Sequence, residues 1–310
     1  MNAQPMEPGL HGYDNSSSHH LEVLVTLIPL TAWATLHFGV QALWRILLSA
    51  VMVMGLDCLG RLFKRMVFRR PIKRLFSLRA AVLGMLIALP MPSTLPIWVL
   101  LAGDLLAALV LLLVGAETYL PLSLPALVGS AMLLVPAARH YPLLVDSENG
   151  RTLLSLLCKG DMPELSIVDM LLGKMDGNMG DVASLLIIVS AIYLMGRGYI
   201  HWQIPLAGIV SAGAVAYFMA PDTMSVFYYV GAHLLSGSFL LVLIYFAADR
   251  TSAPMSPKAG LVYGALYGAI TILLRMNYGI DGTLPAMLIT SVFSYFLDRY
   301  LSPLPFGGRL

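Results

Sequence analysis

The sequence predicts an all-α polytopic membrane protein with about ten transmembrane helices. Hydrophobic residues make up 58% of the 310 residues and charged residues only 12%, and the mean hydropathy is +0.79. This composition excludes an ordinary soluble domain. Apolar runs that match or approach the length needed to cross the roughly 30 Å hydrocarbon layer recur from one end to the other. The chain is therefore expected to form one membrane domain.

Ten apolar runs bounded by turn-forming residues mark the expected helices. They cover residues 21–41, 43–60, 78–92, 94–115, 124–137, 181–195, 202–219, 227–247, 260–274 and 283–297. The third, fifth and tenth runs are short and contain or abut proline. Short, proline-broken helices are tolerated at membrane depth only where protein or a cavity covers their freed backbone groups. These three helices are therefore expected inside the bundle.

The ten runs divide the chain into five parts. They are a polar N-terminal tail (1–20), a first membrane repeat (21–137), a loop (138–180), a second membrane repeat (181–298) and a C-terminal tail (299–310). The N-terminal tail is rich in Pro, Gly, Ser and His and lacks the cationic start and apolar core of a secretory signal.

The distribution of Lys and Arg predicts the orientation. Eight cations lie in the 19-residue connection 61–79, between the second and third runs. Connections rich in Lys and Arg stay on the cytoplasmic side. With ten crossings, both termini are then cytoplasmic and the loop 138–180 lies on the outer face. Thirteen of the 19 Lys and Arg residues fall inside and six, Arg275 among them, outside.

The two cysteines, Cys58 and Cys158, fall on opposite sides of the membrane in this topology and cannot pair with each other. The sequence has no CxxC or Cys/His spacing, so the chain supplies no complete iron–sulfur or zinc site of its own. A cluster shared with another protein of a complex through Cys58 stays open.

Residues 176–182 read Asp-Gly-Asn-Met-Gly-Asp-Val and precede the sixth apolar run. This segment resembles the covalent flavin site of the RnfD/NqrB family of membrane subunits. In that family the motif runs Asp, two variable residues, Ser or Thr, Gly, Ala or Glu, and a Thr that carries flavin mononucleotide through a phosphoester. Asp176 and Gly180 match, whereas Met179, Asp181 and Val182 depart. Valine has no hydroxyl, so the resemblance predicts a chain without covalent flavin.

The resemblance extends over most of the chain and is strongest in the second half. Matching segments lie at 196–197, 202–206, 233–237, 248–249, 254–258, 298–299 and 305–307. The family fold consists of two inverted five-helix repeats and is similar to that of urea channels. The triplet Leu-Pro-Ala occurs at 124–126 and again at 284–286, which is a weak sign of such an internal repeat. The first half has lost polar family residues, as at 78–80, where Leu-Arg-Ala replaces Asp-Gly-Ser.

The resemblance implies the integral membrane RnfD-type component of an Rnf- or Nqr-type ion-translocating electron-transport complex. Such a protein would lie in a bacterial or archaeal cytoplasmic membrane with other membrane and peripheral redox subunits as partners. The cofactor-site residues carried over from the family and its neighbouring polar positions are Asp176, Gly180, Val182, His233, Ser236 and Asp249. Without an acceptor threonine the chain would act as a scaffold, bypass the flavin step, or hold a noncovalent flavin such as FMN or riboflavin. The electron donor, the acceptor and the coupling ion, sodium or proton, stay open.

A function from a different class is a stand-alone small-solute channel or transporter with a urea-channel-like fold. It would require polar or aromatic residues that converge on a pore at the membrane midplane. The apolar replacements in the first half offer few of them.

Three further positions have competing interpretations. Asp104, in the middle of the fourth run, is either part of an ion or proton pathway or a protonated, hydrogen-bonded acid facing a partner. His233 either lines a flavin or quinone site or forms a structural hydrogen bond between helices. Asp181 belongs to an acidic loop that is expected to form a solvated surface and would repel a flavin phosphate.

Overall fold

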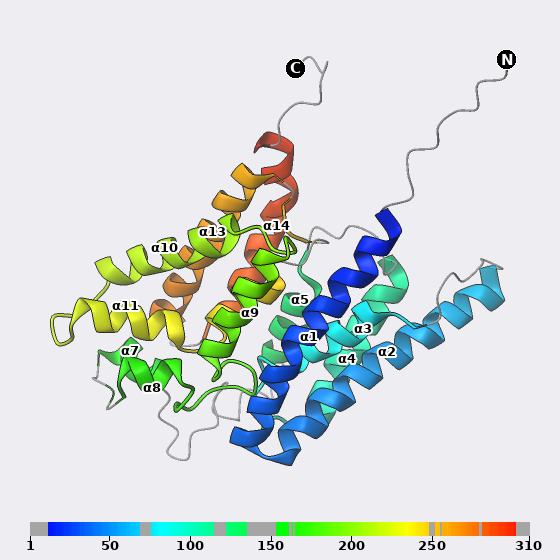
Figure 1. The fold of residues 1–310 in the computed structure, drawn as a ribbon, viewed down its shortest axis with the longest axis horizontal. Coiled ribbons are helices and arrows are strands. Elements are labelled where there is room, and N and C mark those ends of the chain that lie inside the picture. Colours follow the sequence, from blue (N-terminus) through cyan, green and yellow to red (C-terminus); the bar gives the residue numbers. More distant parts are fainter. Residues whose placement is uncertain are drawn as a thin grey trace.

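The computed structural model contains a bundle of helices (Figure 1). The structure describes residues 12–68, 76–114, 122–134, 153–160, 163, 165–247, 252–254, 256–278 and 281–301. Within these ranges every regular element is a helix, which confirms the predicted all-α class. Figure 1 shows the first helices, coloured blue and cyan, on one side and the later helices, coloured green to red, on the other.

The first group contains five helices. They are α1 (Gly12–Phe38), α2 (Val40–Phe68), α3 (Leu78–Ala88), α4 (Ile97–Val114) and α5 (Leu124–Leu134). Gly39 joins α1 to α2 with a φ of 81°, a conformation that glycine adopts without steric cost. Gly84 brings α3 into backbone contact with α2, since a Cβ at that position would lie 2.5 Å from the Ser49 carbonyl oxygen.

The second group contains the later helices and one interrupted element. They are α9 (Ser184–Gly196), α10 (Gln203–Phe218), α11 (Val226–Leu235), α12 (Phe239–Leu241), the π-helix η1 (Val242–Phe246), α13 (Pro257–Tyr278) and α14 (Thr283–Leu301). Helices α10 and α13 approach closely through glycines. A Cβ on Gly264 or Gly268 would lie 2.3 Å from a backbone oxygen of α10. Small residues at helix contacts are typical of packing inside membranes.

Among the described residues between α5 and α9, two short helices precede the second group. They are α7 (Leu153–Lys159) and α8 (Ile167–Leu171). Helix α8 begins at an N-cap, because the Ser166 hydroxyl oxygen accepts a hydrogen bond of 3.1 Å from the Asp169 amide. The Ser166 hydroxyl in turn donates to the Asp169 carboxylate at 2.7 Å, and this bond lowers the pKa of Asp169.

Several helices have the length and composition of membrane spans. His19–Phe38, Val40–Val67 and Pro257–Tyr278 are long and apolar enough to cross alone, and Val226–Leu235 and Phe239–Phe246 reach this length and composition only together, as a bent pair. Four shorter apolar helices accompany them, at Leu78–Ala88, Ile97–Leu113, Ser184–Gly196 and Gln203–Phe218. These features support a multi-pass membrane protein.

Each of the ten apolar ranges contains a helix, but several helix ends differ from the prediction. Helix α1 begins at Gly12 rather than at residue 21, so residues 12–20, predicted to belong to the polar tail, are helical. Helix α2 continues to Phe68 rather than ending at residue 60, and an ion pair of 2.8 Å between Asp57 and Arg61 spans one turn of this extension. The range 227–247, predicted as one span, is interrupted at residues 236–238.

Candidate functional site

The interruption between α11 and α12 lies inside the second group of helices. The chain bends by 59° there, with Ser236 extended at φ −88° and ψ 153° and Gly237 at φ 61°. A Cβ on Gly237 would lie 2.2 Å from the Asp281 carboxylate. Such a break leaves the last carbonyls of α11 and the first amides of α12 without helical partners. In a protein interior these groups require other partners.

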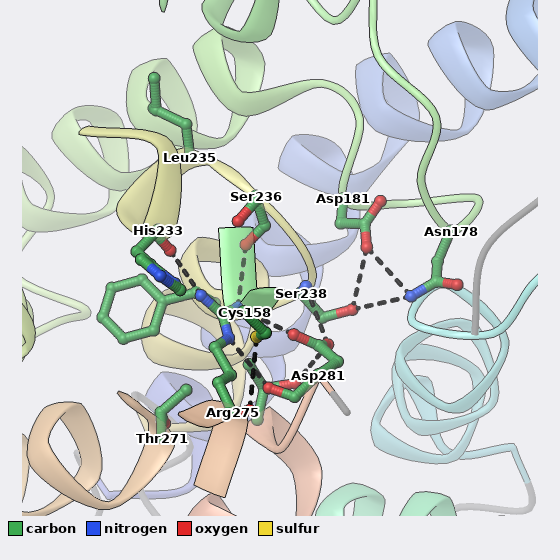
Figure 2. Close-up of polar contacts among 12 residues, drawn as sticks. Cys158, Asn178, Asp181, His233, Leu235, Ser236, Ser238, Thr271, Arg275 and Asp281 are labelled. Atoms are coloured by element: carbon green, nitrogen blue, oxygen red, sulfur yellow. Dashed lines mark hydrogen bonds and ion pairs between the residues drawn. The ribbon is translucent and has the colours of Figure 1, made fainter. Parts of the chain in front are cut away.

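Arg275 of α13 supplies partners for the end of α11. Its side chain is fully buried and donates to the carbonyl oxygens of His233 at 2.5 Å and Ser236 at 2.9 Å. The guanidinium also pairs with the Asp281 carboxylate at 2.8 Å and donates from Nε to the Asp281 carbonyl at 3.0 Å. Figure 2 shows the guanidinium group between these acceptors. The cation therefore occupies the negative end of the α11 dipole.

Asp281 performs the complementary role at the start of α12. Its Oδ2 accepts a hydrogen bond of 3.1 Å from the Ser238 amide and one of 2.8 Å from the Thr283 hydroxyl. A carboxylate at a helix N-terminus is favoured by the dipole and by the free amides. The buried Arg275–Asp281 ion pair thus provides hydrogen-bond partners for backbone groups on both sides of the break.

The segment 176–182 reaches the same break from another direction. Asp181 Oδ2 accepts from the Asn178 side-chain amide at 3.0 Å and from the Ser238 hydroxyl at 3.2 Å (Figure 2). Asn178 also donates to the Ser238 hydroxyl oxygen at 3.3 Å. The prediction that Asp181 belongs to a solvated acidic surface is wrong, because its side chain is only 1% exposed and points to the start of α12.

The middle of this segment is packed against the chain that follows α3. The amides of Met179 and Gly180 donate to the carbonyl oxygens of Met91 at 3.2 Å and Leu89 at 2.7 Å. A Cβ on Gly180 would lie 2.7 Å from the Leu89 Cβ, so glycine permits this approach. Val182 has no exposed surface.

Asp176 lies at the exposed beginning of the segment. It lines a groove of about 610 Å³ with Trp33, His37, Lys174 and others. The motif residues predicted together are therefore separated: Asp176 faces the groove, whereas Gly180 and Val182 are enclosed in the bundle.

His233 and Ser236, two of the expected cofactor-site residues, lie at the break. The buried His233 ring packs edge-on against Tyr229, with 4.5 Å between ring centroids. Among the described residues, neither His233 ring nitrogen nor the Ser236 hydroxyl has a hydrogen-bond partner. The structural hydrogen bond considered for the His233 side chain is therefore not seen there. Asp249 lies outside the described residues.

Arg275 was expected on the outer side of the membrane, and the full burial of its side chain at the break was not predicted from the sequence. The available signal was an arginine directly after an apolar run and six residues before Asp281. Cys158 of α7 also reaches this helix end, since its thiol donates to the Arg275 carbonyl at 3.3 Å. Burial raises the pKa of the Cys158 thiol.

The family model for NQR2, RnfD and RnfE matches residues 5–307. The chain belongs to this family. The membership confirms the resemblance based on the 176–182 segment and the second-half motifs.

Relatives within the family cover nearly the whole chain. The D component of the Na⁺-translocating ferredoxin:NAD⁺ oxidoreductase complex of Acetobacterium woodii is 25% identical over 309 residues, 97% of this chain and 93% of the relative. The D component of the ion-translocating oxidoreductase complex of Methanosarcina acetivorans is 27% identical over 296 residues, 92% and 90% of the two chains. The B component of the Na⁺-translocating NADH-quinone reductase of Pseudomonas aeruginosa is 28% identical over 237 residues, 71% and 59% of the two chains.

Proposed function

We propose that this family member is the D-type membrane component of an Rnf- or Nqr-type electron-transport complex, working without covalent flavin at residue 182. The relatives named above are components of ion-translocating oxidoreductases. The other redox and membrane subunits of such a complex are its proposed partners. The site is proposed to serve as a scaffold or to be bypassed by the electron route.

The observation that carries this proposal is the absence of an available hydroxyl at the flavin position. Val182 has no hydroxyl and no exposed surface. Ser184, the nearby alternative, is 1% exposed, and its hydroxyl donates to the Leu235 carbonyl at 3.1 Å. A phosphoester at Ser184, or at a threonine introduced at position 182, would require this packed region to open.

The break supports a scaffold rather than the alternative solute channel. In transporters with discontinuous helices, the exposed helix ends bind the transported ion or substrate. In this chain Arg275 and Asp281 occupy both helix ends. The chain's own side chains therefore fill the place that a permeant solute would use.

We propose ten membrane crossings arranged as two inverted five-helix repeats. Helices α1–α5 form the first repeat, and α9, α10, the bent α11–η1 element, α13 and α14 form the second. Helix α5 begins with Leu-Pro-Ala, α14 has the same triplet directly after its first residue, Thr283, and the two helices contact each other. The start of α1 and the end of α14 lie at the same end of the bundle (Figure 1), as an even number of crossings requires. Both termini are proposed to be cytoplasmic.

A noncovalent flavin is a second form of the proposal. The groove beside Asp176 has a volume within the range of small-molecule sites. Trp33 offers a ring for stacking and Lys174 a cation for a phosphate group.

The test is purification of the chain with its native partners from mild detergent, followed by flavin extraction without hydrolysis. Co-purification with other membrane subunits and no flavin assigned to this chain would support the scaffold. Extractable flavin that is lost in Trp33→Ala would select the noncovalent form. Isolation as a stable homo-oligomer that conducts a small solute in vesicles would contradict the proposal and favour the channel.

A further inference from the structure

We propose that Asp104 is a proton-binding site within the first group of helices, where its carboxyl group is protonated and donates a hydrogen bond to Ser49. Asp104 lies in the middle of α4 and has no exposed surface. It is separate in sequence from the residues at the break between α11 and α12. The inference therefore does not depend on the proposed flavin-free function.

The first argument counts protons at Ser49. The Ser49 hydroxyl oxygen lies 2.8 Å from the Gly84 carbonyl oxygen and 2.6 Å from Asp104 Oδ1. A serine hydroxyl has one proton to donate and lone pairs with which to accept. The Gly84 carbonyl has no proton, so Ser49 must be the donor in that contact. The contact with Asp104 is then a hydrogen bond only when the carboxyl group supplies the proton.

The second argument is the lack of compensation for a negative charge. Among the described residues Asp104 forms no ion pair, and its Oδ2 has no hydrogen-bond partner. An ionised carboxylate in an apolar interior is costly without a cation or several donors. The neutral acid needs only the one acceptor that Ser49 provides.

The charged groups on the neighbouring helices either bind other residues or lie toward the helix ends. Helices α2, α3 and α5 pack against α4. On α2, Arg45 donates to the Leu95 carbonyl, and Arg61 pairs with Asp57 at 2.8 Å. The remaining cations of α2 and α3 lie toward the helix ends: Lys64, Arg65 and Arg79. The described part of α5 has no charged residue.

These contacts form a chain of hydrogen bonds from Asp104 through the Ser49 hydroxyl to the Gly84 carbonyl. It connects α4, α2 and α3 through two exchangeable protons, one on the Asp104 carboxyl group and one on the Ser49 hydroxyl. Gly84 is required for this arrangement, because a Cβ there would lie 2.5 Å from the Ser49 carbonyl oxygen. The site thus holds a proton at the contact of three helices.

Infrared difference spectroscopy of the purified protein tests this site. Subtracting the Asp104→Asn spectrum from the wild-type spectrum should reveal one carbonyl band of a protonated carboxylic acid, which moves in deuterated buffer. Ser49→Ala should keep this band and shift it to higher frequency, since the acid loses its acceptor. Asp57→Asn, which removes an ion-paired carboxylate, should leave the band unchanged.

The proposal would be overturned if Asp104→Asn removed carboxylate absorption and no protonated-acid band. It would equally be overturned if Ser49→Ala left every protonated-acid band in place. The Ser49→Ala comparison keeps the test decisive if Asp104→Asn does not yield folded protein.

Discussion

Within the part of the chain that the structure describes, the helix interruptions at residues 236–238 and 89–96 satisfy their polar groups differently. At residues 236–238 a buried ion pair between Arg275 and Asp281 supplies donors and acceptors to both helix ends. At residues 89–96, after α3, the amides of Met179 and Gly180 donate to Met91 and Leu89, and Arg45 donates to Leu95. The comparison shows that the abrupt break at residues 236–238 binds charges of both signs, whereas the longer connection between α3 and α4 is satisfied by backbone groups and one arginine.

The segment 176–182 connects these two places. Its amides bind the loop after α3, and its Asp181 and Asn178 side chains bind Ser238 at the break. The segment that resembles the family's flavin motif thus forms a structural connection in this chain. Substitutions at the two places are expected to lower the stability of the protein by different amounts.

The largest loss is expected for Arg275→Met. It would leave Asp281 buried without its cation and the carbonyls of His233 and Ser236 without donors, at a cost of about 3–5 kcal/mol. Thermal unfolding in detergent measures this change. The double variant Arg275→Met with Asp281→Asn should be less destabilised than Arg275→Met alone. A double variant that is as unstable as the sum of the two single variants would contradict the ion-pair account.

Gly237→Ala should cost about 1–3 kcal/mol, because φ 61° strains any residue with a Cβ and the methyl group would meet the Asp281 carboxylate. Gly196→Ala is the matched control, since a Cβ there meets nothing within 4 Å. Equal unfolding temperatures for the two variants would show that the turn at Gly237 is not the constraint described here.

Gly180→Ala should cost about 1–2 kcal/mol by pushing the segment away from Leu89. Gly213→Ala is the control, because its Cβ would make only an ordinary contact of 3.6 Å with Val230. Limited proteolysis should cut residues 172–183 sooner in Gly180→Ala than in the control. If both resist cleavage equally, the backbone bonds to the loop after α3 are not what holds the segment.

The smallest effect concerns the Cys158 thiol. An impermeant maleimide applied to intact cells should label Cys158 slowly and spare Cys58. The rate should rise as the pH increases, because burial raises the pKa of Cys158 and the thiolate is the reactive form. Arg275→Met should speed the labelling by loosening the helix end that this thiol contacts. Exclusive labelling of Cys58 would reverse the proposed orientation.

The positions of the helices could be predicted because apolar runs and prolines are local signals. The break could not, since Arg275 reaches carbonyls 39 and 42 residues away, and an arginine at the end of an apolar run is equally typical of a loop cation. The burial of Asp181 was missed for the same reason, because its partner Ser238 lies 57 residues away. The lack of a phosphoester at Val182 could be predicted from the sequence alone, because the side chain has no hydroxyl. The structure adds that the side chain is enclosed.

In-gel flavin fluorescence of the denatured polypeptide tests the central claim most directly. The chain should be expressed with the other proteins and the flavin transferase of its complex, beside a flavinylated family member as a positive control. The account predicts no fluorescent band for the wild type and little for Val182→Thr, because Met179 and Asp181 also depart from the motif and the segment is enclosed. A fluorescent wild-type band at the mass of this chain would contradict the account and would show that the chain carries covalent flavin.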